Sequence, residues 1–340
     1  HRPAHLQHWK IGDTADGTLT AIQLKSYNVT GAYMGRMLEM GDVALRMYKC
    51  ANVDADEYAV FVNLMTHTAM RGPRNVEGMV GLETAMDQLA EKLGLDALAL
   101  RQKNFAEIDQ TNDLPWSSNG QREAWQLAAD GIDWAHNRKQ VPGSDPGVKK
   151  RGVGLGSRIW SAAGGPPSNA EVQIYGDGSV VVRSSTNDIG EGPKTILSQV
   201  VAEELGIPLD QVHPDFDSSE APWDLASFGS RVTPSMTPTV RNAAAAAKEQ
   251  LFIIAGAMLS ADPGELDARK GQIFVKADPN RAVPFNKVAA ASSHTIIGVG
   301  WRGPNPADYS TQSFGAQAVE VEVDTETGEV KLLNLVAAHD

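Results

Sequence analysis

Residues 188–192 connect an expected strand to an expected helix, and they are the strongest candidate for a binding site. Gly190 and Gly192 let a ligand approach the backbone without meeting a Cβ. Pro193 suits the first position of a helix, where the free N–H groups and the helix dipole favour an anion. The pattern predicts a site for a phosphorylated or otherwise anionic cofactor. A strand, glycine turn and helix are also common in folds without such a site, so this alternative stays open.

Two further loops contain side chains that suit the same kind of ligand. Arg71 next to Gly72 can present its planar guanidinium to an anion or a carbonyl oxygen, or it is a solvated arginine in a turn. Residues 229–233 combine two hydroxyls, an arginine and a glycine, which suits a polar cofactor and equally an ordinary hydroxyl-rich loop. The residues of interest there are Gly229, Ser230, Arg231 and Thr233.

The chain offers no recognisable catalytic set of its own. It has no Gly-x-Ser-x-Gly motif, no Walker loop and no Rossmann glycine spacing after the first strand. Cys50 is the only cysteine, which excludes an internal disulfide, a thiolate zinc site and an iron–sulfur cluster ligated by this chain. We expect no metal ligands from these side chains, so a redox metal would arrive on a cofactor or a partner.

Composition describes a soluble globular protein of 340 residues with 42% hydrophobic and 21% charged residues. A net charge of −12 argues against nucleic-acid binding. No apolar run reaches the roughly 18 residues of a membrane span. Residues 1–5 resemble neither a signal peptide nor a natural start, because they contain no Met and no apolar region. We therefore expect a cytoplasmic protein, with a periplasmic location through a partner's export signal left open.

Periodicity and turn signals predict a mixed α/β chain of the α+β class with two domains. We expect domains at 1–139 and 151–340, joined by a linker over 140–150 that is rich in Pro, Gly and Ser. The expected hairpins cover 11–33 and 314–337, and the expected separate strands cover 43–48, 58–64, 151–160, 169–175 and 179–185. The expected helices cover 76–93, 96–103, 119–137 with Asn119 as cap, 193–205 and 239–259.

Five segments of the chain together resemble the molybdenum hydroxylases, the family of xanthine dehydrogenase, aldehyde oxidase and 4-hydroxybenzoyl-CoA reductase. Each segment alone is weak evidence for this family. They follow the family's order over nearly the whole chain: 69–72 with Glu77 and Glu83, 94–104, 188–206, 230–233 and 315–340. The resemblance implies the two-domain molybdopterin-binding fold with mixed sheets and flanking helices. Residues 1–139 would form the C-terminal part of the first molybdopterin-binding domain, and 151–340 the second.

The resemblance also implies a cofactor and partners. The cofactor would be molybdopterin, in its cytosine dinucleotide form, with molybdenum held by the pterin dithiolene. A 2Fe–2S subunit and an FAD subunit would accept the electrons. The reaction would hydroxylate a small-molecule substrate, an aldehyde or an aromatic N-heterocycle, with oxygen from water.

Carried over by position, Arg71 and Gly72 would lie at the molybdenum, and Arg71 and Glu191 are the catalytic candidates. The other residues implied to bind the pterin or its phosphate side are Ile189, Gly190, Gly192, Thr195, Gly229, Ser230, Arg231 and Thr233.

Several positions depart from the family pattern. Pro73 and Arg74 replace an aromatic residue and a glycine, so Arg74 could narrow the substrate funnel or recognise an acidic substrate. Glu191 replaces a common Gln, and the absence of a cysteine after Arg71 disfavours the carbon monoxide dehydrogenase branch.

The family's glycine-rich pterin loop would lie upstream of His1 and its general-base glutamate downstream of Asp340. We therefore expect either a fragment or one piece of a split molybdenum subunit, with the remaining piece as a further partner. The competing hypotheses are a non-catalytic half that only holds the cofactor and an unrelated α/β nucleotide binder.

Overall fold

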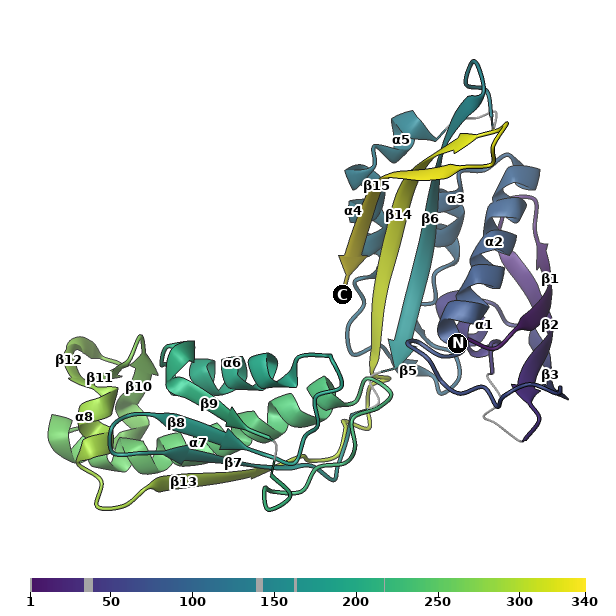
Figure 1. Cartoon of the computed structure of the whole chain (residues 1–340). Coiled ribbons are helices and arrows are strands. Elements are labelled where there is room, and N and C mark those ends of the chain that lie inside the picture. Colours follow the sequence, from purple (N-terminus) through teal and green to yellow (C-terminus); the bar gives the residue numbers. More distant parts are fainter. Residues whose placement is uncertain (1, 34–38, 139–142, 162–163, 217) are drawn as a thin grey trace. The chain divides into compact units, whose positions relative to one another are not determined.

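The structure is a computed structural model that describes residues 2–33, 39–138, 143–161, 164–216 and 218–340. The chain forms two compact units (Figure 1). Unit 1 contains His1–Ser161 and Ala307–Asp340, and unit 2 contains Ala162–Pro306. Each unit combines helices with mixed sheets, which confirms the α+β class.

The described residues of unit 1 form a three-stranded sheet β1-β2-β3, a three-stranded sheet β15-β14-β6, a small sheet β4-β5 and the helices α1 to α5. Its strands are β1 (His5–Asp13), β2 (Leu19–Gly31), β3 (Val53–Phe61), β4 (Ile108–Asp109), β5 (Leu114–Pro115), β6 (Lys149–Ser161), β14 (Gln312–Asp324) and β15 (Val330–His339). Its helices are α1 (Asp42–Met47), α2 (Asn75–Leu93), α3 (Ala97–Asn104), α4 (Gln121–Gly131) and α5 (Trp134–Asn137).

The expected features of unit 1 that rest on strong local signals are confirmed. The hairpin β1–β2 turns at Asp16 and Gly17, and Gly94 ends α2 in the left-handed conformation. Asp96 caps α3 by accepting a hydrogen bond from the Ala99 N–H at 2.9 Å. The buried face of α2 carries the expected apolar stripe, Met79, Leu82, Met86, Leu89 and Ala90.

A buried polar network ties α2 to β6 and α3. Glu83 accepts hydrogen bonds from Arg101 Nε at 2.8 Å and from the Ser157 N–H and Oγ at 3.0 and 2.8 Å. Tyr48 donates its hydroxyl to the same carboxylate. Burial, followed by the nearby Glu83 charge, raises the pKa of Tyr48 well above its ordinary value. Because each partner comes from a different element, the network fixes β6 in unit 1.

Unit 2 contains, among its described residues, the four-stranded sheet β13-β7-β8-β9, the three-stranded sheet β10-β11-β12 and the helices α6, α7 and α8 (Figure 1). Its strands are β7 (Asn169–Ile174), β8 (Val180–Arg183), β9 (Val212–Asp215), β10 (Leu266–Arg269), β11 (Gln272–Val275), β12 (Asp278–Pro284) and β13 (Ile296–Trp301). Its helices are α6 (Pro193–Leu205), α7 (Val232–Leu259), α8 (Phe285–Ala290) and the short 3-10 turns η1 (Leu209–Gln211) and η2 (Pro263–Glu265).

The helix predicted after the glycine loop is confirmed as α6. Pro193 occupies its first turn, and Gly206 ends it with a φ of 68°. Helix α7 packs closely on β13, because Gly298 and Gly300 leave no side chain between the strand and the helix backbone. A Cβ at Gly298 would lie 2.1 Å from the Ala243 carbonyl oxygen, so only glycine fits there.

Four predicted elements differ from the structure. Residues 43–48 form helix α1 and its cap rather than a strand, because Val43, Ala44 and Met47 have helical spacing on a buried face. Strand β3 covers Val53–Phe61 rather than 58–64. Helix 119–137 is divided into α4 and α5, and Asn119 does not cap it, because its amide donates to Glu107. Instead, the Gly120 N–H at the start of α4 donates to Asp340 at 2.9 Å.

Helix α7 begins seven residues before the expected position 239. Val232, Met236 and Val240 are buried at helical spacing and extend the apolar face through the polar segment. Residues 232 and 233 of the predicted loop therefore belong to the first turn of a helix.

The compact units divide the chain at different positions from the domains expected at 1–139 and 151–340. Strand β6 pairs along its length with β14, and both belong to unit 1 together with the C-terminal hairpin. Of the expected linker 140–150, residues 140–142 lie outside the described residues, and β6 already begins at Lys149.

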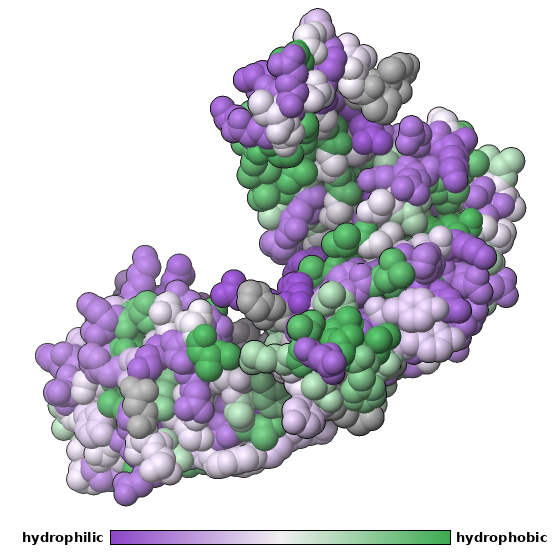
Figure 2. All heavy atoms as spheres, turned by 45° about the vertical axis from the view of Figure 1, so that its right-hand side comes forward, coloured by the Kyte–Doolittle hydropathy of each residue, from purple (hydrophilic) through white to green (hydrophobic). Residues whose placement is uncertain are grey.

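Among the described residues, no helix is both long and apolar enough to cross a membrane, although α7 has 28 residues. Hydrophobic atoms nevertheless form several patches on the face drawn in Figure 2, between larger hydrophilic areas. Scattered exposed apolar side chains are ordinary on protein surfaces.

Candidate functional site

The loop 188–192 lies exposed at the start of α6 in unit 2. Two of its own acidic side chains fold back on it: Glu191 accepts from the Ile189 N–H, and Asp188 accepts from the Gly190 N–H, both at 2.8 Å. Gly190 and Gly192 have φ values of 104° and 79°, so both positions favour glycine. Nothing lies within 4 Å of a Cβ built at either position, so a ligand has room to approach the two glycines, whereas the N–H groups of Ile189 and Gly190 are already bonded to the loop's own carboxylates.

The start of α6 has no side-chain cap. Thr195, the predicted ligand in its first turn, is exposed. An uncapped helix start next to an open glycine loop suits an anionic group, as predicted from the sequence.

The third predicted loop also lies in unit 2, immediately before α7. Gly229 and Ser230 have φ values of 59° and 60°, and the left-handed conformation is unusual for a serine. Ser230 and Thr233 are exposed, whereas the Arg231 side chain is only 4% exposed. Its Nη2 donates to the Gly165 carbonyl at 3.2 Å, and its guanidinium lies 6.0 Å from the centre of the Phe228 ring. Arg231 therefore interacts mainly with the protein itself.

Asp224, which the sequence analysis did not single out, connects these two loops. Its carboxylate accepts hydrogen bonds from Ser168 Oγ and Thr186 Oγ1 at 2.5 and 2.9 Å, and Arg231 Nη1 lies 3.8 Å from Oδ1. Next to it, Ser227 Oγ donates to the Asn187 carbonyl. Thus two loops that were predicted separately form one surface in unit 2. An acidic residue within a polar segment carries no spacing signal, so Asp224 could not be found from the sequence.

Arg71 and Gly72 belong to unit 1, in the loop before α2. The Arg71 side chain is exposed, and among the described residues nothing hydrogen-bonds its guanidinium. The loop itself is held by Arg2, which donates to the Met70 carbonyl at 3.0 Å, to the Arg71 carbonyl and to the buried Glu77 at 2.8 Å. The backbone is therefore anchored while the Arg71 guanidinium stays available.

Arg74, for which a substrate-binding role was considered, lies at the start of α2 with a φ of 68°. Its guanidinium approaches the carboxylates of Glu39 and Asp42 at 3.6 and 3.7 Å. These two acids compete with any acidic substrate for the Arg74 charge.

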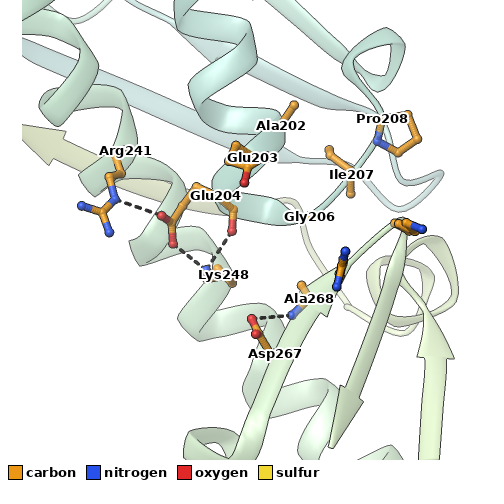
Figure 3. A pocket seen from close by; sticks show the side chains of 12 residues that line it. Ala202, Glu203, Glu204, Gly206, Ile207, Pro208, Arg241, Lys248, Asp267 and Ala268 are labelled. Atoms are coloured by element: carbon orange, nitrogen blue, oxygen red, sulfur yellow. Dashed lines mark hydrogen bonds and ion pairs between the residues drawn. The ribbon is translucent and has the colours of Figure 1, made fainter. Parts of the chain in front are cut away.

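A cleft of about 970 Å³ lies at the opposite end of α6 from the glycine loop (Figure 3). The 13 residues of α6 separate the two ends by roughly 20 Å. Two of the cations that line the cleft are already paired with Glu204, which accepts hydrogen bonds from Arg241 at 3.1 Å and from Lys248. We therefore do not assign this open cleft to the predicted site, despite its size.

The described residues contain no cluster of three or more His, Cys, Asp and Glu side chains that could hold a metal ion. The donor set around the two loops of unit 2 instead suits a polar, anionic organic group. It consists of open glycine backbone, an uncapped helix start and the exposed hydroxyls of Ser230 and Thr233. The buried Nη1 of Arg231 lies behind them, ion-paired with Asp224 but without a hydrogen-bond acceptor. These residues fit a pterin cofactor that carries a phosphate.

Comparison with known families agrees with this chemistry. Residues 127–340 and residues 1–105 each match a family model described as "Molybdopterin cofactor-binding domain". The chain is 29% identical to the aldehyde oxidoreductase molybdenum-binding subunit PaoC of Escherichia coli K12, over 99% of this chain and 45% of PaoC. It is 27% identical to the putative xanthine dehydrogenase molybdenum-binding subunit XdhA of the same strain, over 97% of this chain and 46% of XdhA.

The fold of the chain is that of the molybdenum subunits of molybdenum hydroxylases. The crystal structure of quinoline 2-oxidoreductase from Pseudomonas putida 86 superposes with a TM-score of 0.86 at 21% identity, covering 99% of this chain and 47% of the other. The chain belongs to the molybdopterin-binding large-subunit family of xanthine dehydrogenase, aldehyde oxidoreductase and carbon monoxide dehydrogenase. It spans less than half the length of these relatives.

Proposed function

We propose that this chain forms part of a molybdenum hydroxylase that oxidises an aldehyde or an aromatic N-heterocycle. The observation that carries the proposal is the joining of loops 188–192 and 229–233 around Asp224, within a chain of the molybdopterin-binding family. When bound, the molybdenum cofactor supplies the two-electron redox chemistry and introduces oxygen derived from water.

The chain's own residues would bind and orient that cofactor. The backbone of Ile189, Gly190 and Gly192, with the start of α6 and Thr195, would contact the pterin. Gly229, Ser230 and Thr233 would provide backbone and hydroxyl contacts on its phosphate side. Arg231 would act through the packing of its loop, because its guanidinium is bound to protein groups.

Arg71 and Glu191 are the side chains we propose next to the reacting atoms. Arg71 carries a permanent positive charge that can stabilise negative charge developing on a substrate oxygen. Glu191 is exposed and bonded to its own loop, so it would shape the loop and place a carboxylate at the cofactor. Neither residue is proposed as the general base, which we place outside this chain.

We further propose the cytosine dinucleotide form of the cofactor and partner subunits that carry 2Fe–2S and FAD. The names of the relatives support the subunit organisation, because they describe molybdenum-binding subunits and a complex subunit. These partners would supply the electron acceptors for the chemistry of the bound cofactor.

Elemental analysis of the native complex tests the proposal. We expect close to one molybdenum per chain, together with the pterin and substrate-dependent dye reduction. An intact complex without molybdenum would refute the function.

A second candidate is a non-catalytic half that holds the cofactor until another chain completes the site. It is favoured by the groups at the two loops of unit 2, which suit binding of an anionic group and include no side chain that we propose as the general base. Activity that appears only after a second chain is added would support this half-subunit, and activity of the single chain would exclude it.

A further inference from the structure

We propose that Asp224 is a positioning residue that fixes the two cofactor loops of unit 2 relative to each other. This inference rests on the proposed function, and it concerns a residue that touches neither the substrate nor the exposed surface of the site. The Asp224 side chain is 1% exposed.

The two carboxylate oxygens of Asp224 serve different elements. Oδ1 accepts from Ser168, which directly precedes β7, and it faces Arg231 just before α7. Oδ2 accepts from Thr186, two residues before the glycine loop begins. An amide at this position offers only one acceptor oxygen, so it cannot serve both sides.

The backbone around Asp224 strengthens the same connection. Its N–H donates to Ser185 Oγ at 2.7 Å, and Ser227 Oγ donates to the Asn187 carbonyl. Together with the bond between Thr186 and Asp224, these two bonds join the segment before the glycine loop to the segment before α7. The direction in which each loop presents its backbone depends on the other loop.

The loop before α7 needs such support, because Ser230 has a left-handed φ of 60° that a non-glycine residue adopts at a cost. Arg231 follows directly, and its guanidinium is held between the Gly165 carbonyl, Asp224 and the Phe228 ring. Asp224 thus provides the charge that keeps a buried cation at the base of the loop. Loss of this charge would release the loop without removing any contact to the cofactor.

Two conservative variants separate positioning from simple stability. Thr186→Val removes the hydrogen bond to Asp224 on the side of the glycine loop, together with the bond between the Thr186 and Ser184 hydroxyls at 3.0 Å, whereas Ser168→Ala removes the hydrogen bond on the side of β7. Each variant leaves the buried carboxylate with one hydrogen bond fewer. We expect similar losses of stability against urea from both.

The decisive measurement is the rate at which molybdenum and pterin are lost from the purified native complex. Thr186→Val should accelerate this loss about 10- to 100-fold, in the range found for residues that orient direct ligands. Ser168→Ala should leave the rate within about twofold of the wild type. Asp224→Asn should lose the cofactor as fast as Thr186→Val, and Asp224→Glu should lose it at a rate between those of Thr186→Val and the wild type.

Equal acceleration by Thr186→Val and Ser168→Ala would overturn the inference, because Asp224 would then act only through stability. Unchanged rates in both variants would overturn it as well. A wild-type complex without molybdenum would instead refute the proposed function, so the two failures are distinct.

Discussion

At the scale of single residues, the most consequential side chains of this protein are buried carboxylates that join distant parts of the chain. Glu83 connects α2 to Ser157 of β6, 74 positions later in the sequence. Asp224 connects the loop after β8 to the start of α7. A buried carboxylate is costly unless its hydrogen bonds are satisfied, so each of these residues constrains its neighbours strongly.

The Glu83 network predicts a large difference between two acids that share one partner. Glu83→Ala would leave Arg101 buried without its main counter-charge and should destabilise unit 1 by about 3–5 kcal/mol. Asp87→Ala removes the partly exposed partner of the same arginine and should cost about 0–1 kcal/mol. Urea unfolding followed by circular dichroism measures both. Similar costs for the two variants would contradict the assignment of Glu83 as the central acceptor.

Glu204 predicts a specific pH dependence in unit 2. Partial burial raises the pKa of Glu204, but hydrogen bonds from Lys248 and Arg241 outweigh this and lower the pKa below its ordinary 4.5. Its contribution to stability is therefore present above pH 4.5 and is lost as the pH falls through the lower folded-state pKa. Glu204→Gln should lower stability at pH 7 and flatten the loss of stability below about pH 4.5.

The matched control for Glu204 is its exposed neighbour Glu203. Glu203→Gln should leave the curve of unfolding free energy against pH nearly unchanged. If the unfolding free energy of Glu204→Gln fell as steeply below about pH 4.5 as that of the wild type, this ion pair would not act as described.

At the scale of elements, the sequence predicted those parts whose signals are local. Helix α6 has Pro193 at its start, Gly206 at its end and an apolar stripe between them, so its bounds followed directly. Helix α1 was predicted as a strand, because a segment of six residues is too short to tell the helical period of about 3.6 residues from the strand period of two. The start of α4 depends on Asp340, some 220 residues away, which no local signal reveals.

In the candidate site, too, the sequence predicted the features with a local signal and not those that depend on contacts between distant residues. The glycine loop and the loop before α7 were found because glycine, proline and hydroxyl residues leave a recognisable local pattern. Asp224 was missed, because its importance comes only from the partners that the fold brings to it. The burial of Arg231 was missed for the same reason, since a loop arginine is usually solvated.

The contact between α7 and β13 gives a prediction at this scale. Gly298→Ala would place a Cβ against the Ala243 carbonyl and force the strand away from the helix, which should destabilise unit 2 by about 1–3 kcal/mol or more. Gly303→Ala, where a Cβ would meet nothing within 4 Å, should change the free energy of unfolding by less than about 0.5 kcal/mol. Thermal unfolding of the two variants compares them directly, and equal shifts would argue against this close packing.

At the scale of the whole molecule, unit 2 is one continuous segment, whereas unit 1 is assembled from two segments that flank it. Strand β14 pairs with β6 over thirteen positions, from Gln312↔Ser161 to Asp324↔Lys149, and Phe314 is fully buried in the core of unit 1. Unit 1 therefore needs a strand that the chain supplies only after unit 2 is complete. The two units have separate hydrophobic cores, so their stabilities are expected to be largely independent.

This arrangement predicts that two different truncations both leave unit 2 as the only cooperatively folded unit. The isolated segment 164–306 should fold cooperatively, because its sheets and its core come from within the segment. A chain that ends at residue 306 should keep the transition of unit 2 and lose that of unit 1, because β6 and α4 then lack β14. Differential scanning calorimetry of the three proteins measures this. Retention of both transitions in the chain ending at 306 would show that β14 is dispensable for unit 1, and loss of both would show that the units do not fold independently.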